Sequence, residues 1–230
     1  MDEFSLVQKI IIWAIPVLFA ITLHEVAHGW VALKFGDRTA QMLGRLTLNP
    51  IKHIDPIGTV VVPGILLFLG GFIFGWAKPV PVSFQNLRRP KTDMAWVALA
   101  GPMANLIMGI GWAIIAKIGL ALVQSESSIG EPMMYMGLAG IWINAILMFL
   151  NLLPLPPLDG GRILVSILPN KLGWQVSRIE PYGFFILLGL LALGLLGTIL
   201  SPMLNSTIQV LAYWLGLSFG QTVSLVNGLF

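Results

Sequence analysis

The sequence has no cysteine, only three histidines and few charged residues. Without cysteine the chain has no disulfide, no thiolate nucleophile and no sulfur ligand for a metal. Any metal site must therefore be built from histidine nitrogens and carboxylate oxygens. Charged residues make up 10% of the 230 residues and hydrophobic residues 57%, whereas a soluble domain has about 25% charged and about 45–50% apolar residues. This composition predicts a polytopic membrane protein that forms one integral membrane domain over residues 1–230.

The net charge of +3 does not indicate a nucleic-acid partner. The thirteen Lys and Arg residues are spread over the segments between apolar stretches, where they are read as signals of membrane orientation. The first nine residues, MDEFSLVQK, contain two acids and one lysine, and no small-residue cleavage site follows the apolar run, so no cleavable signal peptide is expected. The expected partner is the lipid bilayer of a cell membrane, and the small size without a targeting peptide suggests a prokaryotic source. The sequence does not predict an oligomeric state.

Apolar stretches of about 20 residues predict membrane-spanning helices. The strong candidates are residues 4–35, 94–123, 135–153 and 183–200, and the weaker ones are 57–76 and 203–217. The predicted fold class is therefore all-α. The first three strong helices would form a catalytic core over residues 4–165, followed by one or two C-terminal transmembrane helices within 181–217.

The positions of Lys and Arg decide how the segment 57–76 is read. Seven basic residues lie between the first helix and the second strong one: Arg38, Arg45, Lys52, Lys78, Arg88, Arg89 and Lys91. If residues 57–76 crossed the membrane, these charges would fall on both sides and violate the positive-inside rule. Pro63, Gly64, Gly70 and Gly71 supply breaks for a re-entrant hairpin, which is the prediction for this segment. The N-terminus is then expected outside and the end of the first helix near the cytoplasm.

The first apolar helix carries the stretch LHEVAHGW at residues 23–30. A charged group at bilayer depth costs about 2.5–3.5 kcal/mol on insertion scales, so His24, Glu25 and His28 together are costly unless they bind something. Residues four apart share one helix face, so both imidazoles can face one ion, and Zn²⁺ suits them. Zinc lowers the pKa of bound water toward about 7, and Glu25 can accept the proton of that water and pass it to a leaving amine. The pattern predicts peptide-bond hydrolysis.

A third protein ligand is required, and the residues alone leave His53, Asp55 and Asp159 open. Asp159 lies in NLLPLPPLDGGRIL (151–164), where three prolines force an extended segment and two glycines permit close backbone approach. An aspartate before glycine is as often a turn or a helix cap as a ligand. Spacing therefore does not decide between the three.

Three motifs on successive helices resemble the site-2 protease family of intramembrane zinc metalloproteases. They are HEVAH, AGPMAN (100–105) and NLLPLPPLDGG (151–161). The resemblance implies that His24, His28 and Asp159 hold one Zn²⁺ per chain and that Glu25 is the catalytic base. It implies regulated intramembrane proteolysis of transmembrane protein substrates. The stretches at 49–58 and 75–84 resemble a compact branch of the family, in which no PDZ or CBS domain is expected.

Three further residues are tentative candidates for binding substrate or the transition state. Asn105 would either hydrogen-bond to substrate and oxyanion or join helices, and Gly101 on the same helix face would allow close packing against the first helix. Asn151, by the resemblance, would help to place substrate beside Asp159. His53 would be structural or a catalytic helper. The alternative function is a membrane metal-ion transporter or channel that uses the same His and Asp cluster, although such a path needs several sites in series.

Overall fold

The structure is a computed structural model that describes residues 4–61, 65 and 78–229. Every regular element in these residues is a helix or a helical turn. The elements are α1 (Leu6–Lys34), α2 (Thr39–Met42), η1 (Pro50–His53), η2 (Pro56–Val61), η3 (Phe84–Asn86), α4 (Pro90–Gln124), α5 (Gly130–Asn151), α6 (Asp159–Ile167), α7 (Asn170–Ser177), α8 (Glu180–Ala192), α9 (Leu195–Leu215) and α10 (Phe219–Asn227). Four of them, α1, α4, α5 and α9, are long and apolar enough to cross a membrane. The structure thus agrees with an all-helical polytopic membrane protein.

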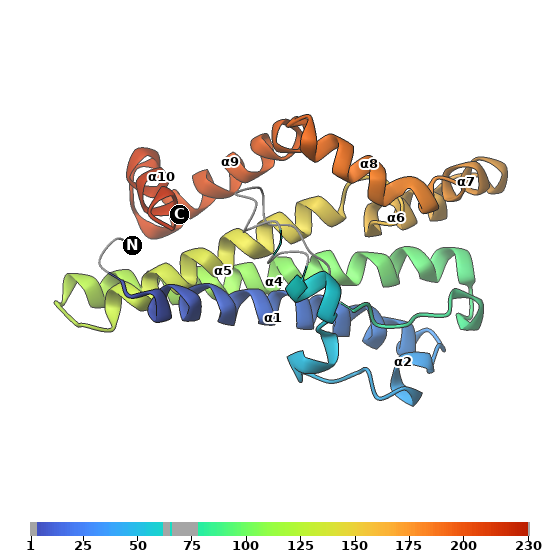
Figure 1. The fold of residues 1–230 in the computed structure, drawn as a ribbon, viewed down its shortest axis with the longest axis horizontal. Helices are drawn as coiled ribbons and strands as arrows, with labels where there is room; N and C mark the ends of the chain where they lie inside the picture. The colour runs from blue at the N-terminus through green and yellow to red at the C-terminus, as the bar shows by residue number, and fades with distance from the viewer. Residues whose placement is uncertain (1–3, 62–64, 66–77, 230) are drawn as a thin grey trace.

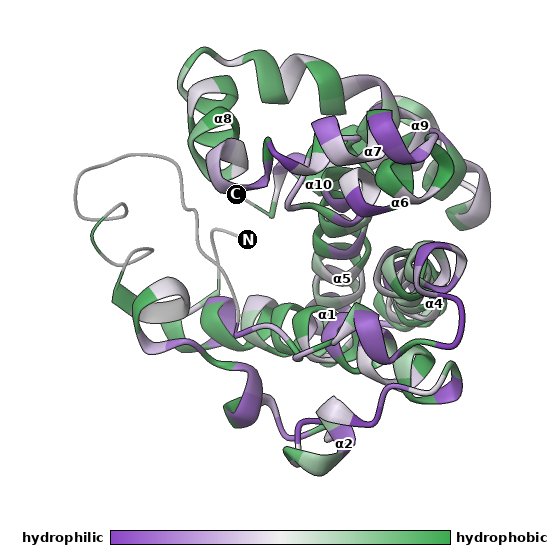
Figure 2. Cartoon of the chain, turned by 90° about the vertical axis from the view of Figure 1, so that its right-hand side faces the viewer, coloured by the Kyte–Doolittle hydropathy of each residue, from purple (hydrophilic) through white to green (hydrophobic). Residues whose placement is uncertain are grey.

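Helices α1, α4 and α5 lie side by side along the length of the molecule, as Figures 1 and 2 show from two directions. Glycines allow α4 and α5 to approach closely: a Cβ on Gly137 of α5 would lie 2.5 Å from the backbone nitrogen of Ala116 on α4. Small residues at such crossings are typical of membrane helices, because close backbone approach supplies the packing that the hydrophobic effect cannot supply in lipid.

The C-terminal stretch divides at a different residue from the one predicted. The sequence prediction placed helices at 183–200 and 203–217, whereas the structure breaks the chain between α8 and α9, at Gly194. Gly194 adopts a left-handed conformation with φ of 70°, which glycine accepts without steric cost. Helix α9 then continues through Pro202, since neighbouring groups in a membrane helix can compensate for the missing N–H of proline.

The predicted re-entrant hairpin at 57–76 falls mainly outside the described residues, which exclude 62–64 and 66–77. Within the described part, Asp55 Oδ1 accepts hydrogen bonds from the backbone N–H groups of Ile57 and Gly58 at the start of η2. The hairpin stays a prediction.

The extended segment before η3 is tied to the end of α1 by Asp37. This buried carboxylate accepts hydrogen bonds from the backbone N–H groups of Thr39 and Ser83 and from the side chain of Asn86. Burial would raise the pKa of Asp37, but the hydrogen bonds from Thr39, Asn86 and Ser83 outweigh it and hold the pKa below its usual value. Asp37 therefore fixes the segment against the helix that carries His24 and His28.

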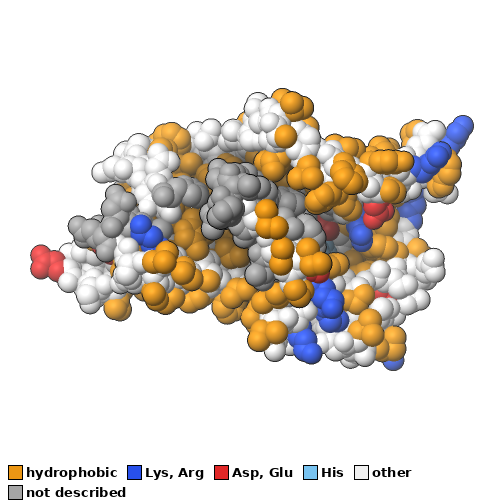
Figure 3. Space-filling model, in the orientation of Figure 1, with side chains coloured by type: hydrophobic (Ala, Val, Ile, Leu, Met, Phe, Trp, Pro, Cys, Tyr) orange, Lys and Arg blue, Asp and Glu red, His pale blue; other side chains and the backbone are white. Residues whose placement is uncertain are grey.

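The surface reflects the apolar composition. Figure 3 shows hydrophobic side chains spread over the visible face, while most of the visible Lys and Arg side chains gather toward one end of the molecule. Many large hydrophobic side chains on the long helices are exposed, among them Ile10, Phe19, Ile107 and Val210. Exposure of this extent suits helices that are surrounded by lipid.

Candidate metal centre

His24, His28 and Asp159 converge at one point between α1, α4 and α6. The Nε2 atoms of the two histidines lie 3.1 Å apart, and Asp159 Oδ2 lies 3.3 Å from each of them. One ligand atom from each residue falls within 4.8 Å of the other two. The structure thus brings Asp159, and neither of the other two candidates for third ligand, to the paired imidazoles.

The local sequence around Asp159 explains its position. Asp159 is the first residue of α6, and the two glycines after it press against the preceding chain. A Cβ on Gly160 would collide with the carbonyl oxygen of Leu152, and one on Gly161 would collide with the backbone nitrogen of Pro156. Only glycines allow this chain reversal, which returns the aspartate toward α1.

The donor set fits a zinc ion. Asp159 Oδ2 is buried and has no hydrogen-bond donor among the described residues. The Nδ1 atom of His24 lies 2.6 Å from Asn105 Oδ1, and that of His28 lies 2.7 Å from the carbonyl oxygen of Val97. When Nδ1 donates its hydrogen to these oxygens, each Nε2 presents a lone pair toward the carboxylate oxygen. Two imidazole nitrogens and one carboxylate oxygen are the ligands of zinc sites that keep a position for water.

Gly101 on α4 makes room for both imidazoles. A Cβ at this position would lie 2.5 Å from Cε1 of His24 and would collide with Nε2 of His28. The sequence interpretation of Gly101 as a residue that permits close packing against the first helix agrees with this contact.

Glu25 lies beside the centre and is held by the extended segment. Its Oε2 accepts a 2.7 Å hydrogen bond from the backbone N–H of Val80. Glu25 and Val80 line a cleft of about 360 Å³ together with the three residues of the centre and with Asn151. The alternation of proline and valine in PVPV explains why this segment is extended, but the sequence did not indicate that Val80 contacts Glu25.

The tentative residues occupy three different positions. Asn151 lines the cleft, and its Nδ2 donates to the carbonyl oxygen of Leu147. Asn105 is fully buried behind His24 and joins α1, α4 and α5, with its Nδ2 donating to Ala20 O and to Asn144 Oδ1. The Nε2 of His53 lies 2.9 Å from Thr47 O, so this imidazole is engaged elsewhere.

Comparison with known proteins agrees with this geometry. The sequence profile of "Peptidase family M50" matches residues 114–193. YwhC of Bacillus subtilis, whose name describes a zinc metalloprotease, is 42% identical over 200 residues, which cover 84% of this chain and 85% of YwhC. The chain belongs to peptidase family M50. Two other relatives carry the same description: Rip2 of Mycolicibacterium smegmatis is 30% identical over 86% of this chain and 70% of its own length, and MJ0392 of Methanocaldococcus jannaschii is 27% identical over 75% and 40%. No solved structure matches the chain.

Membership of M50 confirms the resemblance to the site-2 protease family and makes the chain a zinc metallopeptidase that acts on proteins. The profile match includes Asp159 but not the HEVAH motif. The geometry of α1, and not the profile, therefore supports the roles of His24, Glu25 and His28.

Proposed function

We propose that this M50 peptidase is an intramembrane endopeptidase that cleaves membrane proteins within or next to their transmembrane segments. The observation that carries the proposal is the position of the His24, His28 and Asp159 cluster. Two of these residues lie on α1, a helix that can cross a membrane. A peptidase centre on such a helix meets substrates that share the bilayer.

His24, His28 and Asp159 would hold one Zn²⁺ per chain, with Glu25 as the catalytic base. When bound, a zinc ion would supply Lewis-acid chemistry, which lowers the pKa of a water molecule and polarises a carbonyl group. The Glu25 carboxylate takes up the proton from the water and delivers it to the leaving amine. Val80 orients that carboxylate through its N–H, and Asn151 lies on the wall of the cleft along which substrate would pass.

The metal-ion transport alternative receives no support from the cluster. Among the residues that the structure describes, His24, His28 and Asp159 form one group able to hold a metal, whereas a conduction path needs several such groups in series. Transport would also leave the carboxylate of Glu25 beside the centre without a role.

The distribution of basic residues also supports an orientation of the protein in the membrane. Lys and Arg residues concentrate in the segments that follow α1 and precede α8, while the segment 125–129 between α4 and α5 has none. By the positive-inside rule the end of α1 that carries the metal centre then lies toward the cytoplasm and the N-terminus outside.

The Glu25→Gln substitution tests the proposed chemistry. The variant should bind zinc as the unaltered protein does, because Glu25 is not a ligand, while cleavage of a co-expressed single-pass membrane protein falls by about 10²–10⁴-fold. Metal analysis and cleavage are measured on the same preparations. Equal cleavage by the two proteins would refute the assignment of Glu25.

A further inference from the structure

A chain of two asparagines connects α5 to the metal centre. Asn144 Nδ2 donates to the carbonyl oxygen of Gly140 (2.8 Å), and Asn144 Oδ1 accepts from Asn105 Nδ2 (2.9 Å). Asn105 Nδ2 also reaches Ala20 O (3.3 Å), and Asn105 Oδ1 lies 2.6 Å from His24 Nδ1. Both asparagine side chains are buried. Asn144 does not line the cleft in front of the metal centre.

The backbone carbonyls at the ends of this series of hydrogen bonds determine which group donates and which accepts in each bond. Gly140 O and Ala20 O are backbone carbonyls, which can only accept. Asn144 must therefore turn its amide nitrogen toward Gly140 and its oxygen toward Asn105. Asn105 in turn presents its nitrogen to Asn144 and Ala20 and its oxygen to His24. The hydrogen of the neutral His24 ring then belongs on Nδ1.

We propose that Asn144 and Asn105 are positioning residues that hold His24 in the Nδ1–H tautomer, so that the Nε2 lone pair faces His28 and Asp159. This inference rests on the proposed zinc site. The tautomer of His28 is fixed by a backbone carbonyl, that of Val97, which accepts the hydrogen of Nδ1. His24 has a side-chain amide in that place, and an amide can rotate and offer an N–H instead. Asn144 prevents this rotation, because a rotated Asn105 would turn its oxygen toward Asn144 Oδ1 and Ala20 O.

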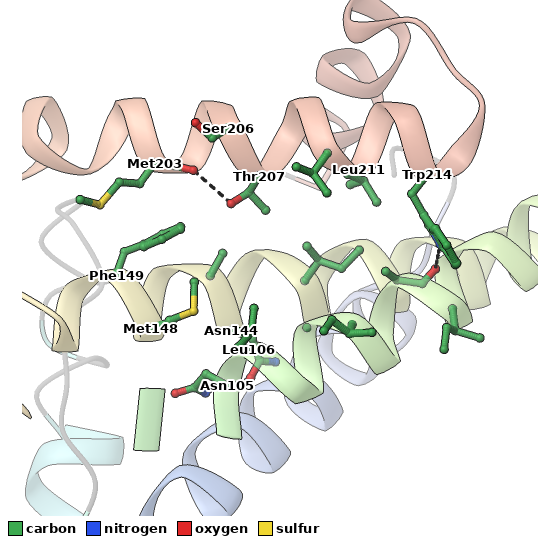
Figure 4. A pocket seen from close by; sticks show the side chains of 17 residues that line it. Asn105, Leu106, Asn144, Met148, Phe149, Met203, Ser206, Thr207, Leu211 and Trp214 are labelled. Atoms are coloured by element: carbon green, nitrogen blue, oxygen red, sulfur yellow. Dashed lines mark hydrogen bonds between the residues drawn. The ribbon is translucent and has the colours of Figure 1, made fainter. Parts of the chain in front are cut away.

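The apolar surroundings of Asn105 and Asn144 help to keep both amides in one orientation. Asn105 and Asn144 border a cavity of about 560 Å³ between α4, α5 and α9, whose lining is mainly apolar (Figure 4). Figure 4 shows the two asparagines close together at one side of this cavity, on the neighbouring helices α4 and α5. Buried amides in an apolar environment have few alternative partners, so the chain of hydrogen bonds keeps one direction.

The test uses the purified full chain in detergent, with zinc affinity and histidine spectra as readouts. Loss of a hydrogen-bond partner behind a metal ligand typically lowers metal affinity by about 10–100-fold. For Asn105→Leu we expect zinc affinity to fall by about 10–100-fold, and for Asn144→Leu by about tenfold. Zinc affinity is measured by competition with a chelator. Thr222→Val is the matched control, because Thr222 is also buried and its hydroxyl donates to the carbonyl oxygen of Ser218, the N-cap residue of α10. The zinc affinity of this variant should not change.

The tautomer is read directly by ¹⁵N NMR of histidine-labelled, metal-stripped protein. The chain has only three histidines, and the structure predicts Nδ1–H for His24 and His28 but Nε2–H for His53, which faces Thr47 O through Nε2. In Asn144→Leu the His24 signals should shift toward the other tautomer while those of His28 and His53 stay.

A variant that restores a hydrogen-bond acceptor for His24 Nδ1 distinguishes a role in positioning His24 from a purely structural role of the two asparagines. In the Asn144→Leu background, Asn105→Asp places a carboxylate against His24, and a carboxylate has no hydrogen to offer. The double variant should regain the His24 spectrum and most of the zinc affinity. A folded double variant that still binds zinc weakly would overturn the proposal, as would an Asn105→Leu protein with unaltered affinity and spectrum. If these results hold but the unaltered protein cleaves no membrane protein, the proposed function fails and the positioning role stands.

Discussion

The backbone N–H of Val80 donates a 2.7 Å hydrogen bond to Oε2 of Glu25, although the two residues belong to different segments of the fold. The segment that carries Val80 is itself anchored at several points. The N–H of Lys78 donates to the carbonyl oxygen of His53, Arg45 donates to Lys78 O, and Ser83 donates to Asp37. The conformation of the proposed base therefore depends on this extended segment as well as on α1.

Replacing Val80 by proline tests that dependence. Proline keeps the chain extended but removes the N–H that orients Glu25. Cleavage should fall about tenfold or more, which corresponds to the loss of one hydrogen bond to a charged group, while zinc content stays the same. Val80→Ala keeps the N–H and serves as the control for the lost side chain. Equal activity of the proline variant would show that the hydrogen bond has no catalytic consequence.

The room at Gly101 gives a second prediction. Gly101→Ala places a methyl group against both imidazoles, and a metal site tolerates displacements of only about 0.5 Å. Zinc affinity should drop by about tenfold or more, as measured by chelator competition. Gly111→Ala on the same helix is the matched control, because among the described residues a Cβ there has no neighbour within 4 Å outside its own helix backbone. Zinc binding by Gly101→Ala that equals that of Gly111→Ala would contradict the position of the imidazoles.

The third prediction concerns stability and pH. Asp37→Asn replaces one of the two carboxylate oxygens that together accept four hydrogen bonds, two from Thr39 and one each from Ser83 and Asn86. The free energy of unfolding should therefore fall by about 1–3 kcal/mol near neutral pH. The folded-state pKa of Asp37 is lowered, so its stabilisation is fully present above the ordinary value of about 3.9 and is lost as the pH falls through the lower folded value.

Thermal unfolding in detergent, followed by tryptophan fluorescence over a pH series, measures this effect. The difference between the unaltered protein and Asp37→Asn should be constant above about pH 5 and should shrink in more acidic buffer. Glu131→Gln, which removes an acid from the first turn of α5, controls for the change in net charge. A difference that grows on acidification would have the wrong sign for this account.

The fourth prediction concerns the substrate. In the cleft in front of the metal centre, a scissile carbonyl would have to reach Glu25 and Asp159. The carbonyl of a helical peptide bond is engaged in the hydrogen bonds of the helix. Glycine or proline placed near the cleavage position of a transmembrane substrate should therefore increase cleavage, and leucine at the same positions should decrease it. The rates are compared by following the product of co-expressed substrates; identical rates would indicate that unwinding is not required.

Much of the site could be predicted because its chemistry is local in the sequence. The spacing of His24 and His28 fixes one helix face, and their position in an apolar run made a bound metal the natural explanation. The approach of Asp159 to the imidazoles depends on the chain reversal at Gly160 and Gly161. Sequence spacing alone therefore does not distinguish Asp159 from His53 and Asp55 as the third metal ligand. The resemblance to a family selected Asp159, and the structure places it at the imidazoles.

Other features depend on packing and left no local signal. The pairing of Asn144 with Asn105 arises only when α4 and α5 are in contact, and the approach of Val80 to Glu25 arises only when the extended segment is anchored at Asp37. The division of the C-terminal stretch at Gly194 was missed because mean hydropathy does not register the backbone conformation of one glycine. Each of these features depends on a contact between residues distant in sequence or on a single backbone dihedral angle, neither of which a local sequence pattern reports.

Zinc content of purified Asp159→Ala, compared with His53→Ala and with the unaltered chain, tests most directly whether the aspartate completes the metal centre. The unaltered chain and His53→Ala should retain about one zinc ion per chain, as expected for a three-ligand site, while Asp159→Ala should lose most of it in the same chelator wash. Full zinc retention by Asp159→Ala, together with loss of zinc from His53→Ala, would contradict the account.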